Sequence, residues 1–173
     1  KTLKKSWALA PHPDVAAAWM DLGPGAPALE RMKWAEKLVK ENPTHLESRL
    51  LLAEAALKAS LWGVARTQLT AATRSQDADR RFYELAAETE RLDGGDESKA
   101  QAWIKALRDA PKPAKWVCQS TGKKFDTWTP LSPADGSFNT LLWGHTVTAP
   151  AAALAIGYAA RANAATPALL PNF

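Results

Sequence analysis

The stretch LESRLLLAEAALKASLWGVARTQLTAATRSQ, residues 46–76, decides the fold of this 173-residue chain. Its small and apolar residues recur at the spacing of helix faces, which predicts two antiparallel helices. Two such helices approach closely only where small residues such as Ala53 and Ala65 face each other, while Leu52 and Leu69 fill the groove between them. The stretch therefore predicts a closely packed helix pair as the unit of the fold.

The same pattern returns further along the chain, which indicates an internal repeat. Leu69 corresponds to Trp103 in this second copy. The first helix of the second copy falls one position short of that offset, and one extra residue in the turn at 93–95 restores the register. The offset is the period of a tetratricopeptide helix pair, about 34 residues, so we expect such units near 46–77 and 78–111.

A partial unit is predicted upstream. Apolar residues at helical spacing over 29–41 indicate the second helix of an earlier unit, which Asn42 and Pro43 end. Before it, Asp14 is expected to cap a helix that runs to residue 20 or 21. Residues 1–113 are therefore expected to be mainly α-helical, a tetratricopeptide-like solenoid of antiparallel helix pairs. Because the first residue falls inside a predicted helix, the chain is expected to be a fragment.

Two similar turns follow the predicted helices. The turns at 118–122 and 132–136 correspond position by position, and each ends in glycine. A zinc ribbon uses two C-x-x-C-G turns, whose four thiolates hold one Zn²⁺. Only the first of the four ligand positions keeps its thiol here. The four vestigial ligand positions are Cys118, Thr121, Ser132 and Asp135.

We therefore predict a degenerate zinc ribbon over 114–148, a small β ribbon without metal that caps the last helix pair. Structural zinc needs four nitrogen or sulfur ligands, and the chain has one Cys and three His. Neither a metal nor another cofactor is expected, and apolar side chains must hold the ribbon together. Residues 149–173 form a tail rich in Ala and Pro, with a short helix expected over 151–162.

Composition and motifs narrow the class of function. The net charge of +4 arises from Lys and Arg interspersed with Asp and Glu, which does not indicate a nucleic-acid partner. One cysteine excludes an intrachain disulfide, and no run of about 20 apolar residues is present. The sequence lacks a G-x-S-x-G elbow, a P-loop and an H-E-x-x-H motif. Its histidines lie at separate predicted turns, so no catalytic site is expected.

The sequence therefore favours a protein that binds other proteins or holds them together. Stacked helix pairs leave a concave surface, lined by their first helices, that presents side chains to a peptide or helix of a partner. Its mixed charge suits protein better than phosphate or anionic lipid. The predicted partner-binding residues are Glu47, Leu50, Glu54, Lys58, Arg80, Tyr83 and Arg91, with Leu57 and Glu90 beside them. For Leu50 and Leu57 the alternative is a place in the core, because the helix is apolar all round at their level.

Four segments in fixed order carry a family resemblance. They are PHPDVAAAW (11–19), ENPTHLESRLLLAEAALKASLWGVAR (41–66), DAPKPAKWVCQSTG (109–122) and WTPLSPADGSFNTLLW (128–143). Together they resemble the carboxy-terminal part of HemY-type tetratricopeptide proteins in their alphaproteobacterial form. The resemblance covers approximately residues 6–148. The ribbon cysteines that some members keep are mostly replaced here.

This resemblance implies a protein of the bacterial inner membrane, with its helical repeats at the cytoplasmic face and a membrane anchor that the present fragment lacks. The implied function is a scaffold without enzymatic activity that holds other proteins, among them haem-pathway enzymes. An alternative it implies is tetrapyrrole binding. In that case the macrocycle would lie between Trp62 and Tyr83, with its propionates on Arg80 or Arg81.

Overall fold

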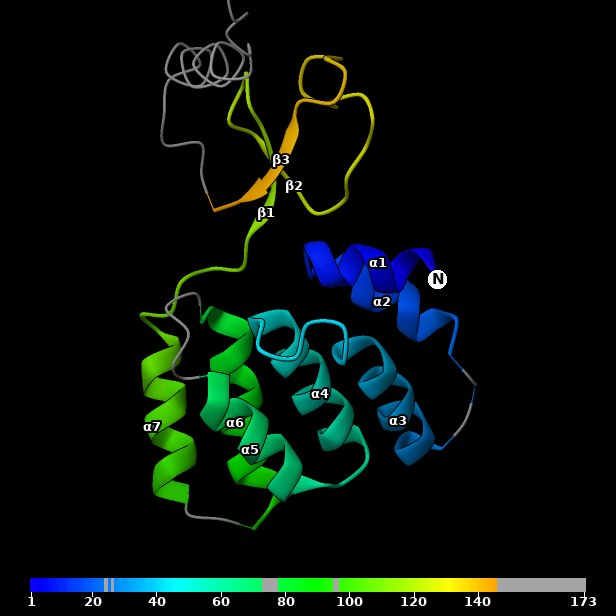
Figure 1. Ribbon diagram of the computed structural model, residues 1–173. Helices are drawn as coiled ribbons and strands as arrows, with labels where there is room; N and C mark the ends of the chain where they lie inside the picture. The colour runs from blue at the N-terminus through cyan, green and yellow to red at the C-terminus, as the bar shows by residue number, and fades with distance from the viewer. Residues whose placement is uncertain (24, 26, 73–77, 95–96, 146–173) are drawn as a thin grey trace, which may run out of the picture. The chain divides into compact units, whose positions relative to one another are not determined.

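The computed structural model describes residues 1–23, 25, 27–72, 78–94 and 97–145. Within them the chain forms seven helices and one antiparallel three-stranded sheet (Figure 1), which confirms the mainly helical class. The helix predicted over 151–162 lies outside the described residues. The elements are α1 (Thr2–Leu9), α2 (Pro13–Asp21), α3 (Ala28–Val39), α4 (Leu46–Lys58), α5 (Trp62–Ala72), α6 (Arg80–Leu92), α7 (Glu97–Leu107), β1 (Lys115–Cys118), β2 (Lys124–Phe125) and β3 (Leu141–Gly144).

The chain divides into two compact units, residues 1–112 and a second unit that begins at Pro113. In the first unit, consecutive helices from α3 to α7 pack against one another in order. Short connections of six residues or fewer join α1 to α2, α3 to α4 and α4 to α5, and such connections favour antiparallel neighbours. The unit is thus a chain of helix hairpins, as the alternation of helices and turns predicts.

The residues that cap α2, α4 and α6 recur at nearly regular intervals along the chain. His12 Nδ1 accepts a hydrogen bond from the backbone N–H of Asp14 (3.1 Å) at the start of α2, and His45 Nδ1 accepts one from Glu47 (3.1 Å) at the start of α4. Asp79 Oδ1 accepts the equivalent bond (2.9 Å) at the start of α6. The three capping residues are evenly spaced to within one position, so α2, α4 and α6 occupy equivalent places.

The expected cap of α2, Asp14, is wrong by two residues. Pro13 occupies the first helical position, where its fixed φ favours a helix start and its missing N–H costs nothing. The capping position therefore falls on the residue before the proline, His12. Asp14 lies in the first turn, where its carboxylate interacts favourably with the positive end of the helix dipole.

Helix α4 is buried on two sides, by two separate core clusters. Leu57 belongs to a cluster of residues from α1 to α5, and Leu50, 5% exposed, belongs to one formed by α4 to α6. The alternative interpretation of these two leucines is therefore the one that the structure supports. Leu50 cannot meet a partner, because its neighbours are core side chains: Leu46, Ala53, Leu69, Ala72, Phe82 and Ala86.

The sheet of the second unit has the order β2-β1-β3. Trp116 on β1 lies directly between Phe125 on β2 and Trp143 on β3, so three aromatic rings share one face of the sheet. Val117, Cys118 and Leu141 are buried. That the ribbon caps the last helix pair stays a prediction.

Candidate functional site

A groove of about 450 Å³ runs along α2 and α4 in the first unit. The wall from α2 is a helical stripe of small or apolar residues with no charge, spaced i, i+3, i+4 and i+7. The wall from α4 carries charged residues at both ends and apolar ones between. The lining residues are Pro13, Ala16, Ala17 and Met20 from α2, Ala28 and Arg31 from α3, Glu47, Leu51, Glu54, Ala55 and Lys58 from α4, and Arg81 from α6.

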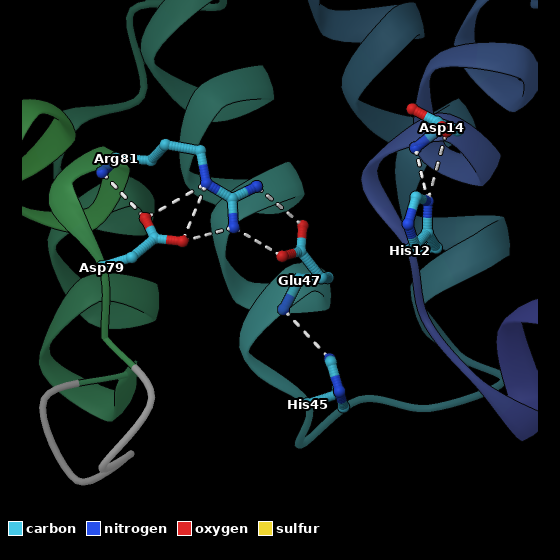
Figure 2. A network of polar contacts seen from close by, with 6 residues as sticks. All are labelled: His12, Asp14, His45, Glu47, Asp79 and Arg81. Atoms are coloured by element: carbon cyan, nitrogen blue, oxygen red, sulfur yellow. Dashed lines mark hydrogen bonds and ion pairs between the residues drawn. The ribbon is translucent and has the colours of Figure 1, made fainter. Parts of the chain in front are cut away.

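Arg81 lies at one end of this groove in a network with two carboxylates (Figure 2). Its Nη1 and Nη2 donate to the two carboxylate oxygens of Glu47, at 3.0 and 2.6 Å. Its Nε and Nη2 donate to the carboxylate of Asp79, at 3.0 to 3.1 Å and 2.6 Å. The two carboxylate side chains are only 12% and 4% exposed, so the network is largely shielded from water. Bidentate geometry of this kind is the strong form of an ion pair.

Burial by itself lowers the pKa of Arg81, but the hydrogen bonds from the guanidinium to Asp79 and Glu47 outweigh it and hold that pKa above its ordinary value. The residue is therefore charged at every physiological pH. Glu47 and Arg81 hold the same place in successive helix pairs, because each lies two positions after the capping residue of its helix. Glu47 of one helix pair thus bonds to its counterpart, Arg81, in the next helix pair.

His12 lies at the same end of the groove, beside Asp14 (Figure 2). Burial lowers the pKa of His12 below its ordinary value of 6.5, and the charge of Arg81 acts in the same direction. The nearby carboxylates of Asp14 and Glu47 oppose this shift without cancelling it. His12 therefore caps α2 in its neutral form at neutral pH.

The other predicted partner-binding residues divide between the groove and other places. Glu54 and Lys58 line the groove and form an exposed ion pair of 2.6 Å. Arg80 lies half-exposed and bonds to Glu84 at 2.8 Å. The rest lie elsewhere: Tyr83 packs on Phe82 and Trp103, Arg91 bonds to Glu88, Glu90 bonds to Arg66, and Leu50 and Leu57 are core.

The sequence did not place Arg81, Arg31 or the wall from α2 among the partner-binding residues, and it indicated Arg81 only for the propionates of a tetrapyrrole. The signal for Arg81 was present, because it is the counterpart of Glu47 in the next unit at the period of the repeat. The residues named for tetrapyrrole binding do not gather in this groove. Arg81 lines it, whereas Trp62 packs against the first core cluster and Tyr83 against the ring of Trp103.

The two glycine-closed turns of the second unit share hydrogen bonds at corresponding positions. Gly122 N donates to Cys118 O and Gly136 N donates to Ser132 O, each at 2.8 Å. Both glycines adopt a left-handed backbone, with φ of 69° and 72°. The residue after each glycine also donates from its backbone to the side chain two positions before it, to Thr121 at 3.3 Å and to Asp135 at 3.1 Å.

Cys118 is fully buried, and Ser132 and Asp135, two of the other three predicted ligand positions, lie close to its thiol. Its Sγ lies 3.2 Å from Ser132 Oγ, 3.1 Å from Ser120 Oγ and 3.9 Å from both carboxylate oxygens of Asp135. Burial raises the pKa of Cys118, but its hydrogen bonds with Ser120, Ser132 and Thr121 outweigh it and lower that pKa to about 6.

Hydroxyl groups make most of the side-chain hydrogen bonds that link Cys118 and Asp135 to their neighbours. Ser120 and Ser137 donate to the carboxylate of Asp135 and hold its pKa below the ordinary range. Among the residues that the structure describes, no group of three or more His, Cys, Asp and Glu side chains is placed to hold a metal ion.

Over the same part of the chain, no helix has the length and apolar character needed to cross a bilayer.

Comparison with known proteins gives one distant relative. The chain is 28% identical over 123 residues to the "Probable magnetosome protein Mms48" of Magnetospirillum gryphiswaldense. The aligned part is 71% of this chain and 27% of that protein, so the chain spans about a quarter of the length of the relative. No protein-family model and no solved structure matches the chain.

Proposed function

We propose that this chain is a non-enzymatic scaffold that binds another polypeptide in the groove between α2 and α4. The observation that carries the proposal is the groove itself, in which an uncharged stripe on α2 faces a stripe of charged and apolar residues on α4. Alanines at 16, 17 and 55 let a backbone approach closely, and the leucine and methionine beside them give it apolar surface. A groove of this kind suits an amphipathic helix of a partner.

A tetratricopeptide-like solenoid is the architecture that we propose for the first unit. Its support is the even spacing of the caps of α2, α4 and α6, together with the order in which the helices pack. In such an array the first helices of successive units line one face, which is where the groove lies. For the second unit we propose a degenerate zinc ribbon, supported by the matching hydrogen bonds of its two turns.

The resemblance to HemY-type proteins leads us to propose in addition a place for the whole protein. We infer that it is tethered to the bacterial inner membrane by a segment outside this chain, with its repeats at the cytoplasmic face, where it holds haem-pathway enzymes. The name of the relative refers to magnetosomes.

A pair of neighbouring substitutions tests the groove. Ala17 lines it, whereas Ala18 is exposed on α2 outside it. We expect Ala17→Trp to abolish capture of partners by the full-length protein and Ala18→Trp to leave capture unchanged. Quantitative mass spectrometry after cross-linking, followed by titration of each purified partner, measures both effects. Equal capture by the two variants would exclude the groove as the binding site.

A further inference from the structure

Resting on the proposed function, we propose that the partner segment is an amphipathic helix of about three turns that runs antiparallel to α4. It carries a carboxylate in its first turn, a lysine or arginine in its last turn, and small apolar side chains between them. The observation behind this proposal is that the two ends of the groove differ in charge.

The first end of the groove is formed by the beginnings of helices. Glu47 lies in the first turn of α4 and Arg81 in the first turn of α6, and the charges of both act on His12, which caps α2. Asp79 joins them through Arg81. Two carboxylates share one guanidinium, so the side chains of this network have a net charge of one negative.

The opposite end lies about 16 Å away, which is the rise of α4 from Glu47 to Lys58. Because α3 is joined to α4 by a short turn and runs antiparallel to it, Arg31 near the start of α3 lies at the same end as Lys58. Glu54, one turn before Lys58, is the carboxylate lining this end. Two cations and one carboxylate give it a net charge of one positive.

The supply of donors and acceptors points in the same direction. At the first end, one guanidinium offers five N–H donors to two carboxylates, which have about eight acceptor sites between them. The carboxylate of Glu47, which lines the groove, therefore has acceptor sites left for a further cation. At the opposite end, the ammonium of Lys58 has three N–H donors beside the single carboxylate of Glu54, so a further carboxylate can bond there. The exposed pair of Lys58 and Glu54 is worth little and yields readily to a new partner.

Charge order then fixes the direction of a bound helix. A carboxylate near the N-terminus and a cation near the C-terminus of a helix complement its own dipole. A segment with this order meets both ends of the groove only if its N-terminus lies beside Arg31 and Lys58. That direction is antiparallel to α4, and the positive end of its dipole then lies beside the negative, C-terminal end of α4.

The test is a selection from a displayed library of helical peptides, each long enough for about four turns, in which every position varies. The baits are the wild-type chain, the groove-filling variant Ala17→Trp, and Lys58→Glu, which reverses the net charge of one end by changing a side chain that is 69% exposed. Circular dichroism and thermal unfolding confirm that each bait is folded. Peptides selected on the wild type are resynthesised and titrated against all three baits.

We expect the selected peptides to carry an acid in the first turn and a base in the last, to lose binding to Ala17→Trp, and to bind Lys58→Glu roughly tenfold more weakly. Selected peptides that lose binding to Ala17→Trp but show no such charge order, or bind Lys58→Glu equally well, would overturn the inference and leave the proposed function standing. A selection that yields no peptide sensitive to Ala17→Trp would overturn both.

Discussion

Trp19 and Trp34 exchange hydrogen bonds: the indole Nε1 of each donates to the backbone carbonyl of the other, at 2.9 and 2.8 Å. Their rings stack with centroids 4.6 Å apart. This exchange joins α2 to α3 and so holds the wall of the groove that sequence reasoning missed. It also requires a residue without a side chain beside it, because a Cβ on Gly23 would lie 2.7 Å from Cδ1 of Trp34.

Gly23→Ala is therefore expected to destabilise the chain by about 1 to 3 kcal/mol, the usual cost of overpacking. Gly63→Ala is the matched control. Gly63 lies in α5 with open space around its Cα, so alanine there should raise the free energy of unfolding by up to about 1 kcal/mol. Urea denaturation followed by circular dichroism measures both changes. Similar effects of the two substitutions would contradict the packing of the tryptophan pair.

The bond between Glu47 and Arg81 should couple two helix pairs. We expect Arg81→Met to lower the free energy of unfolding by about 2 to 3 kcal/mol, since it leaves two shielded carboxylates without their cation. Arg80→Met removes the neighbouring, half-exposed bond to Glu84 and should cost at most about 1 kcal/mol. A double-mutant cycle with Glu47→Gln isolates the coupling. A coupling energy near zero would show that the pair does not join the units.

A zinc site should be recoverable in the paired turns. In a tetrahedral site with Zn–S bonds of about 2.3 Å, sulfur atoms lie about 3.8 Å apart. The distances from Cys118 Sγ to Ser132 and Asp135, 3.2 and 3.9 Å, bracket that value. We expect the triple variant Thr121→Cys, Ser132→Cys and Asp135→Cys to bind one Zn²⁺ per chain, measured by elemental analysis after dialysis.

The control for this restoration is the same triple variant with Cys118→Ser, which should bind zinc far more weakly because one of four ligands is gone. The wild-type chain should keep its fold in a chelator, since hydroxyl hydrogen bonds and aromatic packing hold its turns. A folded triple variant that takes up no zinc would contradict the proposed ribbon.

Stability should depend on pH through His12. Because burial lowers its pKa in the folded chain, the unfolded chain binds this proton more readily, and the free energy of unfolding should fall as the pH drops below the ordinary value of 6.5. His12→Asn keeps an acceptor for the cap of α2 and cannot titrate. Its free energy of unfolding should vary less than that of the wild type between about pH 7.5 and about pH 5. Equal slopes for the two chains would contradict the assignment.

Haem should not bind specifically if the scaffold proposal holds. Arg81 is engaged by two carboxylates, and Trp62 and Tyr83 pack within the helical unit. We expect no saturable shift of the Soret band on titration with haem. A stoichiometric shift that Arg81→Met removes would favour the tetrapyrrole alternative over a polypeptide partner.

Much of the fold follows from local spacing. The period seen in small and apolar residues appears in the structure as evenly spaced capping residues, His12, His45 and Asp79, because each cap depends only on side chains within a few positions of it. The two turns of the ribbon likewise follow from glycines that adopt a left-handed backbone and from short-range hydrogen bonds. Chemistry of this kind can be read along the chain.

The residues of the candidate site could not be predicted in this way, because they depend on how each helix is rotated about its axis and on which helices it contacts. A shift of one residue turns a side chain by about 100° around its helix. The sequence places Arg80 on the binding face, but Arg80 is half-exposed outside the groove and its neighbour Arg81 lines it. For Leu50 the sequence leaves both the binding face and the core open, and the core is correct because α4 is buried on two sides.

The sequence by itself thus determined the helix pairs, their period and the paired turns, since these rest on interactions within one element or one turn. Only the tertiary structure decided that α2 forms one wall of a groove and that Glu47 meets Arg81 at its end. The physical reason is that a groove is made by side chains far apart in the chain, and its shape depends on the rotation and separation of whole helices, which no local pattern specifies.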